Sequence, residues 1–236
     1  MRTVTPAETS PVVRGHAGAR YVMTDYLGSH TAVAPGEQAY LVQQEAAELR
    51  AHFHEVDQFQ VVVGGAGSIG RDAAGRGVVH YTDAFTSYGP IRTDPAVGIS
   101  YLTLRRDPTT GLNYMPEERE KRRRMAGRGE HFTVALDQRL QPGAGLVELA
   151  RSGRGARAYG ARLGAGEELR LDALPAQAGY VVILAGALVR GDHTLPAGSL
   201  VSFEDAGDLA DLAARAVEAS VDVAVEVAVV LFPPAA

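Results

Sequence analysis

Short apolar runs separated by glycine, proline and aspartate dominate the pattern of hydrophobic and polar positions along the chain. Such runs are typical of β-strands, and turn residues between them favour an antiparallel sandwich or barrel over alternating strands and helices. The pattern therefore predicts an all-β fold. The predicted strands include Tyr40–Gln43, Phe59–Val63, Val78–Tyr81, Ile99–Leu104, Gly179–Leu184, Leu200–Phe203 and Val221–Phe232.

Two segments depart from this pattern and predict helices. In Asn113–Arg128, Pro116 is placed for a first helical turn, acidic residues precede basic ones, and Gly127 marks the end. Because acids lie among its bases, we interpret it as a solvated linker helix and not as a nucleic-acid-binding surface. The spacing of apolar residues predicts another helix over Gly207–Ala219.

A weak internal repeat divides the chain into two halves. The triplet Glu48-Leu49-Arg50, followed by the segment 59–65, recurs as Glu168-Leu169-Arg170, followed by the segment 180–186. The offset is about 120 residues, the size of one small barrel. We therefore predict an N-terminal domain over 20–106, a linker with a short helix over 107–130, and a C-terminal domain over 131–234.

Composition narrows the classes of function. The hydrophobic fraction of 46% allows a sizeable core, and the net charge of −5 gives no general attraction to nucleic acid or anionic membranes. Cysteine is absent, which excludes disulfides, thiolate metal sites and cysteine nucleophiles. No apolar run approaches the ~20 residues of a membrane span, and no signal-like segment opens the chain. We expect a bacterial cytoplasmic protein with no nucleic-acid or membrane partner.

The pair His52 and His54 carries the strongest chemical signal. Alternate residues of a strand share a face, so these two imidazoles point the same way, and Gln58 keeps that parity if the strand resumes in phase after a turn. Two imidazoles at such positions can both reach one ion at about 2.0–2.1 Å. The alternatives are two surface histidines, or a hydrogen-bonded pair in a polar pocket.

The segment around these histidines resembles the first motif of the cupins. That motif runs His-x-His, three or four residues, Glu, about six residues, Gly; here its histidines fall on His52 and His54, its acid on Gln58, and its glycine on Gly64 or Gly65. The resemblance covers Ala32–Arg106, and the second half only by pattern. It implies two tandem cupin barrels, each a double-stranded β-helix or jelly roll.

The resemblance also implies a metal site, whose residues depart from the usual cupin motif. His52, His54 and Gln58 would hold one divalent transition metal (iron, zinc, manganese or nickel), and a neutral amide is a weaker ligand than the usual carboxylate. The usual closing histidine falls on Tyr88 or Ser87 in 79–90, with His80 one strand earlier as an alternative. Tyr88 would act as a proton donor or orienting phenol, and His80 as a candidate general base.

One further reading of this region stays open. Glu55 or Asp57 could supply a carboxylate if the turn shifts the phase, which would make a two-histidine-one-carboxylate triad.

In the second half no register restores a metal site, because the matching positions are Asp172 to Ala176 and Ala178 to Tyr180. His193 lies in a hairpin-like turn and is interpreted as a surface residue.

These observations support two classes of function. The first is a metal-dependent enzyme acting on a small polar or anionic molecule in the first barrel, with oxygenase, isomerase or lyase chemistry; fold alone does not choose among them. The second is a metal-free bicupin that binds a metabolite or serves as a scaffold. A DNA-binding regulator is disfavoured because the chain lacks a helix-turn-helix segment and has the wrong net charge. Since bicupins commonly associate, we expect a homodimer.

Overall fold

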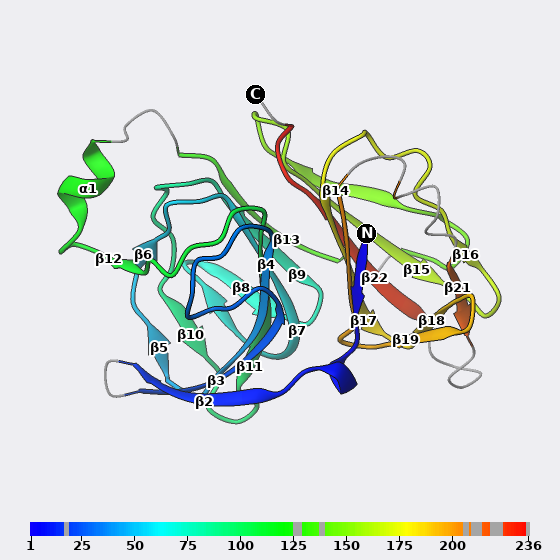
Figure 1. Cartoon of the computed structure of the whole chain (residues 1–236), viewed down its shortest axis with the longest axis horizontal. Coiled ribbons are helices and arrows are strands. Elements are labelled where there is room, and N and C mark those ends of the chain that lie inside the picture. Colours follow the sequence, from blue (N-terminus) through cyan, green and yellow to red (C-terminus); the bar gives the residue numbers. More distant parts are fainter. Residues whose placement is uncertain are drawn as a thin grey trace. The chain divides into compact units, whose positions relative to one another are not determined.

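The computed structural model of the chain describes residues 1–16, 19–124, 129–136, 140–204, 208, 214–217 and 224–234. The described residues are nearly all β, which confirms the predicted fold class. They group into two compact units, shown in Figure 1. The N-terminal unit is Thr9–Ala135, and the C-terminal unit combines Met1–Glu8 with Leu136–Ala236.

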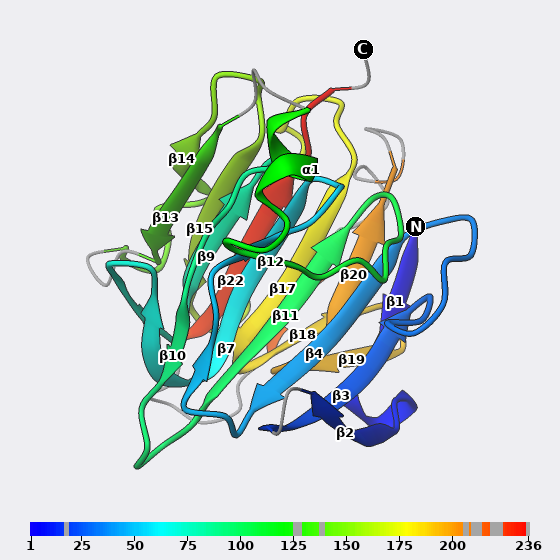
Figure 2. The same cartoon turned by 90° about the vertical axis from the view of Figure 1, so that its left-hand side faces the viewer.

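The N-terminal unit is built on an antiparallel sheet in the order β13-β9-β7-β11-β4-β3-β2, which is seen face-on in Figure 2. Shorter strands form a second layer, in which β10 pairs with β5 and β7, β8 pairs with β7, and β12 pairs with β6. The elements are β2 (Pro11–His16), β3 (Ala19–Leu27), β4 (Gln38–Gln44), β5 (Glu48–Leu49), β6 (His52–Phe53), β7 (Gln58–Ile69), β8 (Asp72–Gly75), β9 (Val78–Thr82), β10 (Ile91–Thr93), β11 (Ile99–Arg105), β12 (Asn113–Tyr114), α1 (Arg119–Arg123) and β13 (His131–Ala135).

Strand β7 belongs to both layers because a bulge redirects it. Its pairing with β11 shifts at Val63, and Gly65 follows with φ +73°. A Cβ atom at Gly65 would lie 2.1 Å from the carbonyl oxygen of Gly98, so only glycine fits this turn of the strand. The first half of β7 therefore lies in the main sheet, and its second half pairs with β8 and β10.

The C-terminal unit repeats this plan. Its main sheet has the order β1-β20-β17-β22-β15-β14, and a second sheet has the order β16-β21-β18-β19. Its elements are β1 (Arg2–Val4), a 3-10 turn (Pro6–Glu8), β14 (Val147–Arg151), β15 (Arg157–Leu163), β16 (Glu168–Leu169), β17 (Gly179–Ala185), β18 (Ala187–Arg190), β19 (His193–Pro196), β20 (Leu200–Phe203), β21 (Ala214–Val217) and β22 (Val225–Leu231).

The two main sheets correspond strand by strand. Read from one edge, β13-β9-β7-β11-β4-β3 matches β1-β20-β17-β22-β15-β14, and the shorter strands match in the same way. The repeated triplets begin equivalent strands, since Glu48 and Glu168 open β5 and β16. One edge strand of each main sheet is distant in the sequence from the strand that it pairs with: β1 pairs with β20, and β13 pairs with β9.

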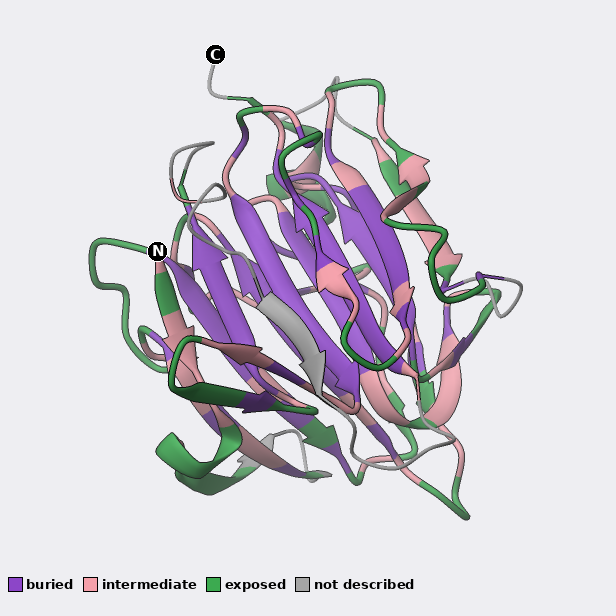
Figure 3. Cartoon of the chain, turned by 90° about the vertical axis from the view of Figure 1, so that its right-hand side faces the viewer, coloured by how far each residue is buried: buried purple, intermediate pink, exposed green. Residues whose placement is uncertain are grey.

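The interior of the C-terminal unit is apolar. Every residue of β17 and β22 is buried, as the purple strands of Figure 3 show, and both read as continuous apolar runs apart from Glu226. Strands covered on both faces have this composition, whereas strands with one wet face alternate. One cluster contains leucines, Phe203 and the valines Val181, Val201, Val225, Val227 and Val229 of β17, β20 and β22.

The strands were predicted better than the helices. All the named apolar runs lie on strands, with residues 221–223 outside the described part of the chain. The helix expected over Asn113–Arg128 is confined to α1, because Asn113 and Tyr114 pair with β6 as strand β12; residues 125–128 are not described.

The helix predicted over Gly207–Ala219 is wrong over Ala214–Val217, although Asp208 is helical. Ala214–Val217 forms strand β21, which pairs with β16 and β18, so sheet pairing overrides the helical spacing there. The remainder of that segment, apart from residue 208, lies outside the described residues. The expected linker 107–130 is grouped with the N-terminal unit, as is 131–135, because β13 pairs with β9. In the described part of the chain, no helix has the length and apolar character of a membrane span.

Candidate functional site

A cavity of about 290 Å³ lies inside the N-terminal unit. Its walls come from strands β2, β3, β4, β7 and β11, from the histidine segment 52–54, and from the segment 109–112 that follows β11. The residues that line it are Arg14, Tyr21, Met23, His30, Tyr40, Val42, Leu49, His52, His54, Gln60, Tyr88, Tyr101, Thr103, Arg105, Thr109, Thr110, Gly111 and Leu112.

Strand register explains why polar side chains gather here. Tyr40, Thr103, Gln60 and His80 are successive partners across β4, β11, β7 and β9, and we call them the polar row. Two residues nearer the end of β11, Arg105 is paired with Gln38. Because side chains two residues apart share a face, the polar row and the Arg105–Gln38 pair project to the same side of the sheet.

Backbone carbonyls orient the two histidines of the sequence motif. Nδ1 of His52 lies 2.7 Å from the carbonyl oxygen of Arg50, and Nδ1 of His54 hydrogen bonds the carbonyl oxygen of Gly111. In each case Nδ1–H donates, which leaves the lone pair of Nε2 available inside the unit. Their rings meet edge to face with centroids 5.2 Å apart.

The hydroxyl of Tyr88 connects His52 and Gln58 by hydrogen bonds. Its Oη lies 2.8 Å from Nε2 of His52 and 2.6 Å from Nε2 of Gln58. The backbone places it there, since His52 and Tyr88 exchange two N–H···O bonds across an isolated bridge. Because Gln58 donates its amide hydrogen and His52 presents a lone pair, the phenol donates its own proton to Nε2 of His52.

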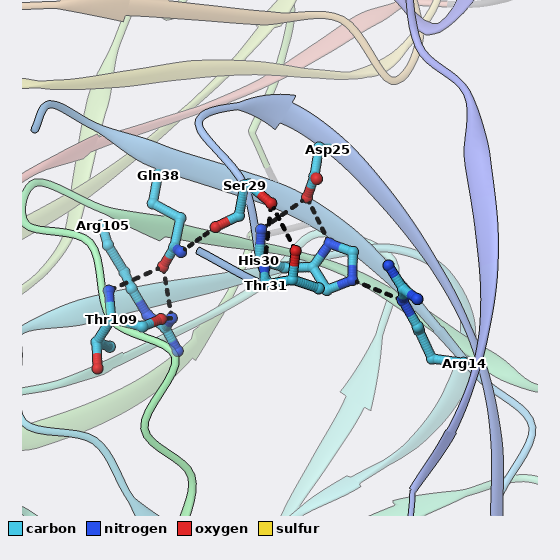
Figure 4. A network of polar contacts seen from close by, with 8 residues as sticks. All are labelled: Arg14, Asp25, Ser29, His30, Thr31, Gln38, Arg105 and Thr109. Carbon is cyan, nitrogen blue, oxygen red and sulfur yellow. Dashed lines mark hydrogen bonds and ion pairs between the residues drawn. The ribbon is translucent and has the colours of Figure 1, made fainter. Parts of the chain in front are cut away.

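Arg105 begins this chain of hydrogen bonds. It is 2% exposed, and its Nε and Nη2 donate to Oε1 of Gln58 at 3.1 and 2.9 Å. Its Nη1 donates to Oε1 of Gln38 at 2.7 Å and to the carbonyl of Thr109 at 3.0 Å, as Figure 4 shows. These acceptors are neutral, and together they orient the guanidinium.

Nη2 of Arg105 also lies 3.2 Å from Nδ1 of His54. Nδ1 cannot accept that bond while it donates to Gly111, and the carbonyl oxygen of Gly111 can only accept. We therefore assign the proton to Nδ1 of His54, so the contact with Arg105 is a close approach and not a hydrogen bond.

Two buried polar atoms beside Tyr88 lack hydrogen-bond partners. They are Nε2 of His80 and Oε1 of Gln60, neighbours in the polar row. Nδ1 of His80 lies 2.9 Å from Oγ1 of Thr133, and its ring centroid is 5.0 Å from that of Tyr88. A buried polar atom without a partner costs free energy, so a bound group that satisfies both atoms would be stabilised.

Burial sets the protonation states. Burial lowers the pKa of His52 to about 4 and that of His80 to about 3, and it lowers the pKa of His54 well below its usual value. The charge of Arg105 lowers the pKa of His52 and His54 further. Burial raises the pKa of the Tyr88 phenol. At neutral pH the three imidazoles and the phenol are therefore all uncharged, and Arg105 is positive.

A second polar chain lies at the side of the cavity where β2 and β3 run. Nδ1 of His30 is 2.6 Å from Oδ1 of Asp25, and Nε of Arg14 donates to Nε2 of His30 at 3.3 Å, as Figure 4 shows. Sequence reasoning missed Arg14, His30 and Arg105. His30 and Arg14 lack a local motif, but Arg105 breaks the apolar pattern of a central strand, a signal that was available.

The structure brings together His52, His54, Gln58, His80 and Tyr88, all buried; of these, His52, His54 and Tyr88 line the cavity, and Gln58 and His80 do not. It places the other candidates elsewhere: Ser87 is half-buried and does not line the cavity. Asp57 accepts hydrogen bonds from the backbone of Ala84 and the hydroxyl of Tyr81, and Glu55 pairs with Lys121, so neither carboxylate faces the cavity. His193 is exposed on β19, as expected for a surface residue.

The donor atoms fit a divalent transition metal in part. Neutral imidazole Nε2 atoms whose Nδ1–H is held by a carbonyl are the usual form of a histidine ligand. However, Oε1 of Gln58 is engaged by Arg105, and Oη of Tyr88 takes the lone pair of His52. Among the described residues, no three His, Asp or Glu side chains are placed to hold one ion. A metal on His52 and His54 would require Tyr88 to turn aside.

Comparisons with known proteins establish the fold and no more. The chain matches no protein-family model. It also matches no curated protein sequence. Its structure is similar to the pirin YhhW of Escherichia coli in complex with nickel(II), at 9% identity and a TM-score of 0.56, covering 99% of both chains.

Two further solved structures are similar to the chain in fold. An oxalate decarboxylase is similar at 12% identity and a TM-score of 0.61, covering 99% of this chain and 77% of the other; related structures of this enzyme are from Bacillus subtilis. AerE of Microcystis aeruginosa is similar at 12% identity and a TM-score of 0.55, covering 95% and 98%. Such neighbours are cupin-family proteins. The chain thus has a cupin-like fold, in which the N-terminal unit carries the buried histidines.

Proposed function

We propose that the N-terminal unit is a cupin barrel whose cavity is the active site of an enzyme acting on a small anionic metabolite. In this proposal the C-terminal unit is a second cupin barrel without a site, and the chain forms a homodimer. The observation that carries the proposal is the matched orientation of His52 and His54, whose Nδ1–H groups are both held by backbone carbonyls. That arrangement fixes two neutral Nε2 atoms inside the unit.

The residues suited to hold a divalent transition metal are His52 and His54, with Gln58 or His80 as a third ligand. When bound, such an ion supplies Lewis-acid or redox chemistry of the kind that oxygenases, isomerases and lyases use. No carboxylate of the described residues lines the cavity, and Arg105 adds a positive charge. A cation there would be repelled by Arg105, so an anionic substrate would stabilise both charges.

The protein's own groups supply the proton chemistry. A directed chain of hydrogen bonds runs from Arg105 through Gln58 and Tyr88 to His52, and each group donates to the next. Tyr88 keeps its proton at neutral pH, so it can donate that proton to a substrate oxygen once it leaves His52. His80 is the candidate general base, because its buried Nε2 has no hydrogen-bond partner; its pKa of about 3 makes it a weak base, and it does not line the cavity.

Metal analysis of protein purified without a nickel column tests the proposal. We expect about one transition metal per chain after reconstitution with iron, zinc, manganese or nickel, and none in the His52→Ala/His54→Ala variant. The matched control is His193→Ala, on an exposed turn. No binding of any of the four metals would refute the metal-dependent enzyme. Size-exclusion chromatography with light scattering tests the homodimer.

A second candidate function is favoured by Tyr88 itself. Its phenol hydrogen bonds His52 and Gln58, which completes a polar network without any ion. We propose that a metal-free bicupin binding a metabolite is the alternative. Thermal shift measurements separate the two functions: metals raise the melting temperature of an enzyme with a His52–His54 site, whereas only a metabolite raises that of a metal-free binding protein.

A further inference from the structure

Apart from the Arg14–His30 pair beside β2 and β3, the cavity is polar at the Arg105 end and apolar at the Tyr101 end, and this polarity identifies a class of ligand. Arg105 is at the end of β11, and Tyr101 lies four residues earlier on the same face. At about 3.3 Å per residue, the two positions are roughly 13 Å apart along the strand. The polar row, at Thr103, lies between them.

The apolar end is built in register. Met23, Val42 and Tyr101 are successive partners across β3, β4 and β11. Leu49 of the second layer packs against the same cluster, and Tyr21 and Leu112 also line this cavity. Aliphatic and aromatic side chains that line a cavity favour an apolar ligand surface, because burying it removes it from water.

The polar end is positive. Arg105 lines the cavity, and its position is fixed by Gln58, Gln38 and the carbonyl of Thr109. No carboxylate of the described residues lines the cavity. A buried guanidinium is suited to attract a carboxylate, and its attraction is strong where water is excluded.

Volume limits the size of the ligand. A water molecule occupies about 30 Å³ of liquid, so a cavity of about 290 Å³ holds roughly ten non-hydrogen atoms. We propose that the N-terminal unit binds an apolar monocarboxylate of about this size, with its carboxylate at Arg105 and its hydrocarbon body against Val42 and Tyr101. This inference rests on the proposed function for the location of the site and names its substrate class.

Calorimetric titration of the full chain with matched small molecules tests the inference. The probes are 3-phenylpropionate, its neutral analogue 3-phenylpropanol, and succinate, which is anionic at both ends. We expect 3-phenylpropionate to bind at least tenfold more tightly than either of the others. Equal affinity for the alcohol, tighter binding of succinate, or a dissociation constant of the acid above about 1 mM would overturn the inference.

Variants examine the two ends separately. Arg105→Met is expected to reduce affinity for the acid at least tenfold, with Arg106→Met, the next residue of the chain, as its control. Val42→Phe fills the apolar end and is expected to abolish binding, with Val33→Phe, on an exposed residue, as its control. Val42→Phe removes no hydrogen bond, so it tests the inference even if Arg105→Met does not fold. Unchanged affinity in Val42→Phe would refute the assignment.

Titrations with and without a chelator distinguish this inference from the metal site. If the acid binds but no metal does, the metal-dependent enzyme fails and the ligand class stands. If a metal binds on His52 and His54 but the alcohol binds as well as the acid, the ligand class fails and the metal site stands.

Discussion

The two units place very different side chains at equivalent positions of the same sheet. In the N-terminal unit the polar row is Tyr40, Thr103, Gln60 and His80. In the C-terminal unit the equivalent partners across β15, β22, β17 and β20 are Tyr159, Val229, Val181 and Val201, which we call the valine row. All four belong to the hydrophobic core of that unit.

This difference shows that the fold does not need the polar row. Three valines fill the equivalent positions in a sheet of the same strand order, and the tyrosine is kept in both. Gln60 and His80 each leave a buried atom without a partner, which costs stability. The N-terminal unit therefore carries polar groups that its sheet would fold without, and this is expected of a site that binds a ligand.

The largest effect is expected when the valine row is made polar. Val181→Gln places an amide at a position with no exposure and should lower the free energy of unfolding of the C-terminal unit by about 3–5 kcal/mol. Denaturant unfolding combined with peptide-resolved hydrogen exchange measures the loss in each unit. Val189→Gln, on a half-buried position of β18, is the control and should cost about 0.5 kcal/mol or less. A loss below about 1 kcal/mol at Val181 would break the comparison.

Acid should destabilise the N-terminal unit selectively. The folded-state pKa values of His52 and His80 are about 4 and about 3, below the ordinary value of 6.5. Below pH 6.5 the unfolded chain binds protons that the folded unit does not, so stability is present above pH 6.5 and is lost as pH falls toward 4. The loss is about 1.4 kcal/mol per pH unit for each histidine.

The C-terminal unit provides the internal control for this acid effect. Its one histidine in the sequence, His193, is exposed. Peptide-resolved hydrogen exchange at pH 7 and pH 5 should show faster exchange in β7, β9 and β11 than in β17, β20 and β22 at the lower pH, after correction for the intrinsic rate. Equal changes in the two sets of strands would contradict the assigned burial of the histidines.

Replacing a polar residue by its apolar counterpart should have a small effect on stability. Gln60→Val copies Val181 and removes an amide whose Oε1 has no partner, so we expect a change in unfolding free energy within about 1 kcal/mol. Binding of 3-phenylpropionate should nonetheless fall. Gln177→Val is the control, because this buried glutamine donates to the carbonyls of Gly155 and Phe232 and should cost more, about 1–3 kcal/mol. A greater loss at Gln60 than at Gln177 would show that the polar row supports the fold.

The smallest effects are expected where the two units are alike. Asp25 is the strand partner of Tyr40, and Glu148 is the partner of Tyr159. Their side chains are 33% and 31% exposed, and Asp25 pairs with His30 while Glu148 pairs with arginines. Asp25→Asn and Glu148→Gln should each cost about 1 kcal/mol or less in chemical denaturation. A clearly larger cost for one of them would reveal a further difference between the units.

The sequence predicted the strands and the inward pair of histidines because both depend on local rules. A period of two sets the face of a strand residue, so the alternation alone places His52 and His54 on one side. The positions of Arg105 and His30 depend instead on which strands are neighbours, and that information is not local. Tyr88 was identified from a motif, but its contact with His52 follows from a backbone bridge that no spacing shows.

The two failures of helix prediction have the same origin. Asn113–Tyr114 and Ala214–Val217 both read as helical, yet each supplies the partner of a strand far away in the sequence. The partners lie about 60 positions earlier for β12, and about 47 and 28 positions earlier for β21, and such pairing overrides local propensity.

Strand β1 pairs with β20, which lies almost 200 residues later in the sequence, and this separation affects the order of folding during synthesis. Arg2 is synthesised well before its partner Ser202, so the segment 2–4 stays unpaired while the N-terminal unit is completed. Long separations in sequence slow folding, because loop closure precedes any gain from contact. A fragment that begins at Leu136 would lack this strand altogether. We expect that the C-terminal unit reaches its native state only when 1–8 is present, supplied in the same chain or as a peptide.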